Sequence, residues 1–297
     1  MSMGAVQSTS IAVMKDEARV PQTARLNSES YNAIEENGFI NCANDALSTF
    51  SSDVDSASYT NIRRFINRGT LPPAGAVRIE EMVNYFTYNY QHPKDESPLH
   101  IVTEVGPSPF HKEYKLVKIG ITAKDIDVSK LPPSNLVFLI DTSGSMNSPD
   151  KLPLLKKSLK LLVEKLGKDD RVTIITYAGS DRVALEPTSG SSHKIINAAI
   201  DAMRSAGSTN ASDGIYTAYK LAEQVHIPNG NNRIIIASDG DFNVGVTSRD
   251  ELQKLVEEKR KTGIFLTVLG FGTCNYHDDT MEILADKGNG NYAYIDS

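Results

Sequence analysis

One acid and three hydroxyl-bearing residues, Asp141, Thr142, Ser143 and Ser145, follow one short apolar run in this sequence. The run at residues 136–140 leads directly into Asp141, and the hydroxyls of Ser143 and Ser145 come shortly after it. A carboxylate and alcohols are hard oxygen donors, which suit Mg2+, Mn2+ or Ca2+ and do not suit zinc or copper. The D-x-S-x-S spacing therefore allows one loop to supply an acid and two hydroxyls to a single ion.

Donors of the same kind occur in two other segments. Thr209 lies in "SAGSTNAS", and Asp239 and Asp241 lie in "SDGDFN", directly after a second apolar run. No His or Cys occurs in any of the three segments. Ligands that are mostly neutral hydroxyls leave a divalent ion with net positive charge, and such an ion attracts an external carboxylate. The donor set therefore favours binding of an acidic partner over metal storage.

Each of these residues also has a common structural explanation. Asp, Ser and Thr are frequent at helix N-caps and in turns, and Asp239-Gly240 alone is typical of a turn. Ser148 precedes Pro149, which fits an N-cap with proline at the first helical position. We assign Ser148 to capping, so the functional interpretation depends on the three segments meeting at one edge of one sheet.

Several catalytic motifs are absent from these segments. An aspartic protease carries D-[ST]-G, whereas Ser143 separates Thr142 from Gly144 here. An aspartyl-phosphate phosphatase carries a second Asp at the position that Ser143 occupies. Neither G-x-S-x-G nor a P-loop is present, and the pattern places no His beside the serines.

The elements that carry the three segments alternate in type from residue 136 onward. Runs typical of strands lie at 136–140, 172–177, 182–185, 233–237, 264–269 and 292–295. Amphipathic periodicity predicts helices at 149–166, 192–203, 213–224, 249–261 and 278–286. This alternation predicts an α/β fold, a doubly wound, mostly parallel sheet flanked by helices, with an antiparallel edge strand at 182–185. Ligands of such sheets bind at the carboxyl ends of the strands, where the three segments are expected to meet.

A smaller α+β region is predicted upstream of this sheet. Residues 1–40 have no periodicity and are interpreted as a flexible tail or linker. The companion region at 41–133 is predicted to contain a strand at 47–54, helices at 59–66 and 79–86, and a hairpin of strands at 99–105 and 115–122. Asp53 and Asp55 are assigned to capping the first of these helices. We expect this region to pack on the domain at 134–297 and to add its hairpin to it.

The bulk composition excludes some classes of function. The 297 residues carry a formal charge of -6, which argues against a nucleic-acid partner. No apolar run approaches the roughly 20 residues of a membrane-spanning helix, so no integral membrane segment is predicted. Cys42 and Cys274 form neither a disulfide framework nor a zinc spacing. The first residues show no signal peptide, which fits a cytoplasmic protein or a fragment cut downstream of its export signal.

The three oxygen-rich segments together resemble a known family. "DTSGSM", "GSTN" and "SDGDFN" are similar, in order and position, to the loops of the metal-ion-dependent adhesion site in von Willebrand factor type A domains. Residues 48–88 and 268–296 resemble one bacterial branch, the YfbK-type proteins. The resemblance implies a Rossmann-like von Willebrand factor A fold at 134–297 that stops before the final helix usual in such domains.

The resemblance also implies a role for each candidate ligand. Ser143 and Ser145 would coordinate Mg2+ directly, with Mn2+ or Ca2+ as substitutes. Asp141 and Asp239 would hold the ion directly or through water, and Thr209 would be the ligand from the third loop. The open position would take an exposed Asp or Glu of a protein partner.

The predicted function is therefore a non-enzymatic, metal-dependent adhesion or assembly module of the bacterial cell envelope, periplasmic or surface-exposed. Asp241, Asn243 and Asn210 are adjacent to the predicted ligands and are expected to support them. The alternative is a metal-dependent hydrolase or phosphotransfer enzyme that uses the same oxygen cluster, although no general base is evident. A second alternative is a structural assembly subunit that leaves its metal site empty.

Overall fold

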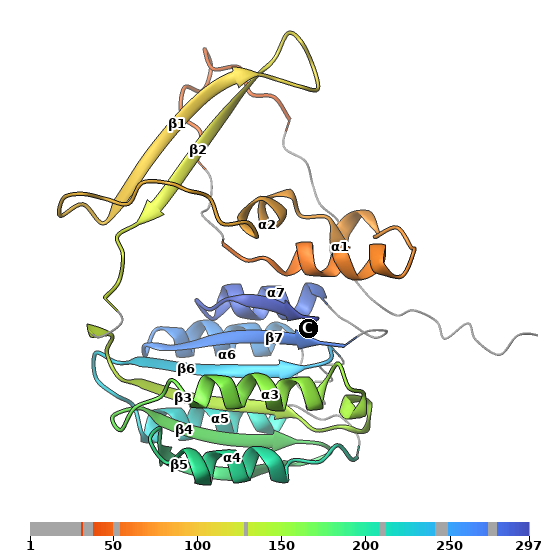
Figure 1. Cartoon of the computed structure of the whole chain (residues 1–297), viewed down its shortest axis with the longest axis vertical. Coiled ribbons are helices and arrows are strands. Elements are labelled where there is room, and N and C mark those ends of the chain that lie inside the picture. The colour runs from red at the N-terminus through yellow and green to blue at the C-terminus, as the bar shows by residue number, and fades with distance from the viewer. Residues whose placement is uncertain are drawn as a thin grey trace, which may run out of the picture.

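The computed structural model describes residues 31, 38–49, 54–127, 130–207, 212–240, 249–272 and 278–296. A six-stranded sheet with helices on both faces forms the larger part of this structure (Figure 1). Its strands are β3 (Ser134–Asp141), β4 (Arg171–Tyr177), β5 (Asp181–Ser189), β6 (Asn231–Ser238), β7 (Ile264–Phe271) and β8 (Tyr292–Ile295). Their spatial order is β5-β4-β3-β6-β7-β8, with β5 antiparallel to β4 and the other neighbours parallel. The predicted doubly wound sheet with an antiparallel edge strand is confirmed.

Helices cover the sheet on both faces because the central strands are apolar on both sides. The helices are α3 (Leu152–Val163), α4 (His193–Ala202), α5 (Ser212–Gln224), α6 (Arg249–Arg260) and α7 (Asp278–Lys287). Phe138 and Ile140 of β3 pack in the cluster that includes α3 and α4, whereas Val137 and Leu139 pack in the cluster of α5, α6 and α7. Alternating residues of one buried strand thus serve two cores.

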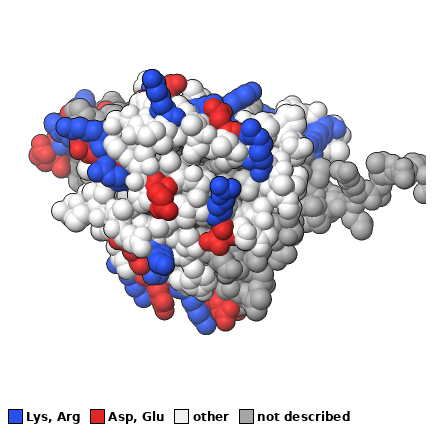
Figure 2. All heavy atoms as spheres, turned by 90° about the horizontal axis from the view of Figure 1, so that it is seen from below, with Lys and Arg blue, Asp and Glu red and all other residues white. Residues whose placement is uncertain are grey.

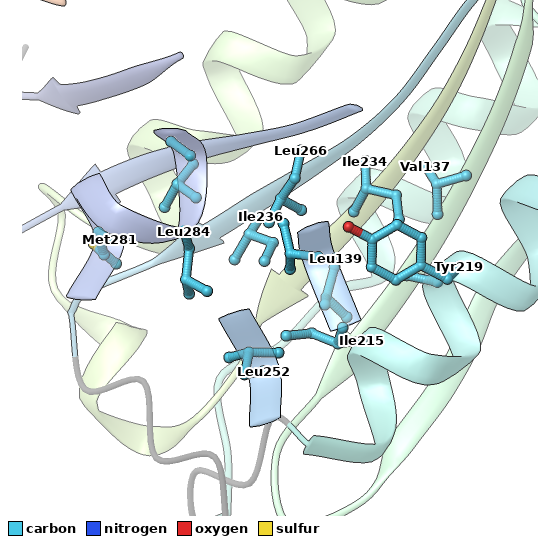
Figure 3. Packing of buried hydrophobic residues seen from close by; sticks show 14 of the residues in the cluster. Val137, Leu139, Ile215, Tyr219, Ile234, Ile236, Leu252, Leu266, Met281 and Leu284 are labelled. Atoms are coloured by element: carbon cyan, nitrogen blue, oxygen red, sulfur yellow. The ribbon is translucent and has the colours of Figure 1, made fainter. Parts of the chain in front are cut away.

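Figure 3 shows the core on the side of α5, α6 and α7. Aliphatic side chains from the three central strands meet side chains from the three helices, including Val137, Leu139, Ile234, Ile236, Leu266, Ile215, Tyr219, Leu252, Met281 and Leu284. Burial raises the pKa of the Tyr219 phenol, which lies among these aliphatic groups. This packing holds the central strands rigidly, so the loops at their carboxyl ends start from fixed positions.

The start of α3 differs from the prediction. A short 3-10 turn, η3 (Gly144–Asn147), follows β3, and the next residue, Ser148, has an extended backbone with φ -69° and ψ 154°. The helix begins only at Leu152, and its preceding residue, Lys151, makes no side-chain cap hydrogen bond. Ser148 Oγ donates to Asp150 Oδ1 instead. The assignment of Ser148 as the N-cap is therefore wrong, because the chain uses residues 148–151 to turn between η3 and α3.

Two helices of the upstream region lie against the end of the large sheet where β8 and α7 are found (Figure 1). They are α1 (Ala57–Asn67) and α2 (Ile79–Asn84), with the 3-10 turn η1 (Ala74–Ala76) between them. Arg63 of α1 holds Asp296 through Nη2–Oδ1 and Nε–Oδ2 distances of 2.5 and 3.0 Å. The Asp55 carboxylate accepts the Tyr292 N–H of β8 at 3.1 Å.

Asp55 therefore joins the upstream region to β8. Ser56, the residue before α1, makes no side-chain cap hydrogen bond. The assignment of Asp55 to capping did not foresee its contact with β8. The Asp55 carboxylate accepts a hydrogen bond from Tyr292, a residue more than two hundred positions away in the sequence. Asp53 lies outside the described residues. The predicted strand at 47–54 does not form at residues 47–49 or 54, and its other residues also lie outside the described part.

The hairpin of β1 (Leu99–Pro107) and β2 (Lys115–Ala123) forms where the sequence predicts it. It is a separate two-stranded sheet that projects away from the main body, so the expectation that it joins the larger domain's sheet is wrong (Figure 1). Tyr90 lies against one face, next to Gly120, and the other face exposes aliphatic side chains such as Val105 and Val117. The division of the chain at residues 40 and 133 stays a prediction. None of the described helices is long and apolar enough to cross a membrane.

Candidate metal centre

The candidate site lies where the direction of winding changes in the sheet. From β3 the chain passes to β4 on one side, and β6 lies on the other side of β3. β3 and β6 are parallel and are paired up to Ile140 and Ala237, so their carboxyl ends lie side by side. Asp141 ends β3 and Asp239 follows β6 directly. This is the switch point at which open α/β sheets bind their ligands.

Asp141 is fully buried and held by two hydrogen bonds. Its Oδ1 accepts the Ser143 backbone N–H at 2.8 Å, and its Oδ2 accepts the Ser238 hydroxyl at 3.1 Å. Burial raises the pKa of this carboxyl to about 6, the hydrogen bonds from Ser143 and Ser238 oppose the rise, and the nearby charge of Asp239 adds to it. The sequence interpretation missed Ser238, although this residue opens the quoted segment "SDGDFN".

The two predicted serine ligands are brought together beside Asp141. Ser143 Oγ and Ser145 Oγ lie 2.9 Å apart. Ser143 is buried and Ser145 is exposed, so the pair extends from Asp141 towards solvent. Met146, fully buried in the core of α3 and α4, anchors the turn that follows. The first loop (residues 141–146) therefore presents the side chains of Asp141, Ser143 and Ser145 from one rigid turn.

Lys151 is a second residue that the sequence interpretation missed. Its Nζ lies 2.7 Å from Asp239 Oδ2, and the two side chains are 12% and 2% exposed. Gly272, after β7, lies directly behind the lysine, since a Cβ at this position would come within 2.1 Å of Lys151 Cε. The only sequence signal for this contact is a basic residue just before the apolar face of α3.

The chain leading to the third predicted ligand also reaches the first loop. Ala206 N–H donates to Thr142 O at 2.8 Å, and Gly144 N–H donates to Gly207 O at 3.1 Å. These two bonds fix the segment at 204–207 against the first loop. Thr209 itself lies outside the described residues, as do the predicted supporting residues Asn210, Asp241 and Asn243.

The donor set at this position fits a hard divalent cation. Two buried carboxylates, Asp141 and Asp239, lie close enough for one to raise the pKa of the other, and two hydroxyls adjoin them. Lys151 neutralises Asp239, but no cation pairs with Asp141 within the described part of the chain. In the same part, no group of three His, Cys, Asp or Glu side chains could hold a metal, so hydroxyl oxygens would have to complete the ligand set. Such a mixture of carboxylate and hydroxyl oxygens suits Mg2+.

Comparison with known proteins gives matches over both parts of the chain. The model of the von Willebrand factor type A domain matches residues 135–297, and a second model, described as von Willebrand factor, matches residues 25–118. The protein YfbK of Escherichia coli (strain K12) is 45% identical over 284 residues, which are 93% of this chain and 48% of YfbK. The protein sll0103 of Synechocystis sp. is 26% identical over 61% of this chain and 42% of its own length. The chain thus spans less than half the length of these two relatives.

Among solved structures, a von Willebrand factor type A protein from Catenulispora acidiphila aligns with a TM-score of 0.48 at 17% sequence identity. The alignment covers 71% of this chain and 48% of that protein.

Proposed function

Because this chain belongs to the von Willebrand factor type A domain family, in its YfbK branch, we propose that it binds Mg2+ at the switch point and thereby holds an acidic protein partner. Domains of this family are in general interaction modules, and the family commonly binds a divalent metal ion. The observation that carries the proposal is the meeting of Asp141, Ser143, Ser145 and Asp239 at the ends of two neighbouring strands. The match between that position and the known ligand position of such sheets supports it.

Each described residue has a separate task in the proposed site. Ser143 and Ser145 would offer hydroxyl oxygens to the ion, and Asp141 and Asp239 would offer negative charge, directly or through water. Thr209 would complete the set from the third loop. Ser238 and the Ser143 N–H fix both oxygens of Asp141, which removes the cost of ordering this carboxylate when the ion binds.

Bound Mg2+ would supply a fixed positive charge that attracts the partner's carboxylate. The strength of this attraction depends on how far the protein's own charges neutralise the ion. Three of the five predicted ligands are neutral hydroxyls, and Lys151 balances Asp239. The remaining negative charge, on Asp141, therefore compensates only part of the charge of a divalent ion. Binding of a carboxylate from a partner protein is then favoured.

We also propose that the module is not an enzyme and that it works at the bacterial cell envelope. Support for the first point comes from the environment of Asp141, whose oxygens are both held by hydrogen bonds, so it is poorly placed as a general base. The resemblance to the bacterial branch supports the second point. Fractionation of cells that express the native gene at its own level tests the location, and an exclusively cytoplasmic protein contradicts it.

The site can be tested with a matched pair of double variants. Ser143→Ala/Ser145→Ala removes the paired hydroxyls of the proposed site. Ser189→Ala/Ser191→Ala removes another pair of serine hydroxyls, which lie 3.1 Å apart and exposed at the end of β5. Isothermal titration calorimetry should show Mg2+ binding to the wild type and the control, and at least about tenfold weaker binding to the site variant.

Two results would overturn parts of this proposal. If the wild type binds no Mg2+, the metal site is wrong. If the Mg2+-loaded protein turns over ester or phosphoester substrates, and Ser143→Ala/Ser145→Ala abolishes this turnover, the enzyme alternative replaces the binding module.

A further inference from the structure

A cavity of about 410 Å3 adjoins the first loop on the side of β5. Thr142 forms one wall, and the turn between β4 and β5 forms a second through Ala178 and Ser180. The segment that follows α4 forms a third through Met203 and Ala206. This volume is within the range of sites that bind small molecules or a few side chains, roughly 300 to 1,000 Å3. None of the described metal-site residues lines it, but the loop that carries them does through Thr142.

Thr142 connects the cavity rigidly to the proposed metal centre. It stands between Asp141 and Ser143 in the sequence. Its backbone N–H donates to Tyr177 O at 3.0 Å, and its carbonyl accepts the Ala206 N–H at 2.8 Å. Gly207, with φ +83°, lies close to the Ala178 carbonyl and closes the wall, since a Cβ there would come 3.2 Å from that oxygen. A partner that reaches the metal centre therefore has this cavity directly beside its contact point.

The lining of the cavity is small and positively charged. Five alanines line it: Ala178, Ala184, Ala199, Ala202 and Ala206. Arg182 and Arg204, both exposed, also line it, and none of the described lining residues is acidic. Arg204 is held in place, because its Nη1 donates to Met203 O at 2.8 Å.

Two acidic side chains on the elements around the cavity have partners of their own. Asp201 pairs with Lys160 at 2.6 Å, and Asp181 accepts the Thr217 hydroxyl at 2.6 Å. Figure 2 looks at the molecule from the side of β5 and α4, and shows Lys and Arg interspersed with Asp and Glu over that face. The positive lining is thus a local feature of the cavity, and its charge complements an anionic group.

We propose that this cavity binds the part of the partner chain next to the acid held at the metal centre, and that this part carries a second acidic side chain. The proposal rests on the proposed function, since the first acid is the one at the Mg2+ site. The alanine lining accepts an extended chain with small residues between the two acids. Arg182 and Arg204 form charge-assisted hydrogen bonds with the second acid. Partners are thereby selected by a pair of acids and not by a single one.

A displayed library of 12-residue peptides with one fixed central Asp tests this directly. Selection is done on the wild-type protein with Mg2+ and, in parallel, with EDTA. It is repeated on Arg182→Gln, on Arg182→Gln/Arg204→Gln, and on Lys194→Gln. The last variant removes an exposed cation from the other end of α4 and is the matched control. Thermal melting confirms that each variant is folded, and Arg182→Gln leaves the backbone contacts of Arg204 intact.

The expected result is a Mg2+-dependent enrichment of peptides with a second Asp or Glu near the fixed one. An enriched peptide should bind about fivefold more weakly to Arg182→Gln, and bind Lys194→Gln like the wild type. Two outcomes overturn the inference and leave the proposed function standing. In the first, Mg2+-dependent enrichment yields peptides without a second acid. In the second, the arginine variants select the same second acid as the wild type. Absence of any Mg2+-dependent enrichment overturns the proposed function and this inference with it.

Discussion

Lys151 Nζ lies 2.7 Å from Asp239 Oδ2, and this ion pair joins the start of α3 to the end of β6. The Asp239 side chain is buried and that of Lys151 is 12% exposed, so the ion pair is largely removed from water. The other buried carboxylate of the site, Asp141, has hydrogen-bond donors but no cation partner among the described residues. The site therefore contains one neutralised acid and one acid that an external cation can neutralise.

Replacement of Lys151 by Met should destabilise the metal-free protein. The change leaves the Asp239 carboxylate buried without its cation, which typically costs about 3 to 5 kcal/mol. Urea unfolding in EDTA measures this loss, and addition of Mg2+ should restore more stability to the variant than to the wild type. Lys160→Met is the control, because its partner Asp201 is 62% exposed and such pairs contribute at most about 1 kcal/mol. Equal losses in the two variants would contradict the role given to Lys151.

Replacement of Asp141 by Asn should change how stability depends on pH. Burial raises the pKa of Asp141 from 3.8 to about 6, so the folded protein binds a proton more tightly than the unfolded chain. The associated stability is fully present below pH 3.8 and is lost as the pH rises through about 6. In EDTA at pH 8, Asp141→Asn should therefore be more stable than the wild type by about 1 to 3 kcal/mol. Urea unfolding from pH 5 to 8 measures this, and a difference that does not vary with pH would rule out the assigned pKa.

Mg2+ binding should weaken in acid for the same reason. The ion prefers the ionised carboxylate, so below the Asp141 pKa of about 6 it must displace a proton. The affinity should fall about tenfold for each pH unit below 6 and should level off above it. Calorimetric titrations in buffers of different ionisation enthalpy also count the released proton. A flat affinity between pH 5 and 7 would exclude Asp141 as the titrating ligand.

Replacement of Gly272 by Ala should displace the Lys151 side chain that pairs with Asp239. A Cβ at Gly272 would come within 2.1 Å of Lys151 Cε, and the backbone has φ +74°. Gly69→Ala is the control, because Gly69 has a similar φ of +70° but no atom within 4 Å of the added Cβ. Both variants incur backbone strain of about 1 kcal/mol, and Gly272→Ala should cost more and also alter Mg2+ affinity. If the two variants lose the same stability and bind Mg2+ equally, Gly272 does not position Lys151.

The order of elements could be predicted because each strand and helix has a clear local pattern. Strands such as β6 are apolar on both faces and are bounded by polar turns, so their positions follow from the sequence alone. β5 was predicted at 182–185 but extends over Asp181–Ser189, since a half-exposed edge strand mixes polar and apolar residues without a sharp boundary. The same physics explains why Asp141 and Asp239 could be expected together: parallel neighbours end at one edge.

Long-range pairings of polar side chains could not be predicted in this way. Lys151 and Asp239 are 88 residues apart, and nothing in the local sequence of either indicates the other. Ser148 shows the converse error, in which a local pattern predicts a structure that does not form. Its position before Pro149 fits a helix cap. The backbone instead turns at 148–151 and brings Lys151 to Asp239. Local propensity was overridden here by a contact between distant elements.

The contact between Asp55 and Tyr292 has a consequence for self-association. β8 is the last strand of its sheet, and an uncovered edge strand invites pairing with another chain. The Asp55 carboxylate takes the Tyr292 N–H at 3.1 Å, and Arg63 holds Asp296 just beyond the end of the same strand. A side chain cannot propagate a ladder of backbone hydrogen bonds, so within the described part of the chain the segment before α1 blocks strand addition at the Tyr292 N–H of this edge.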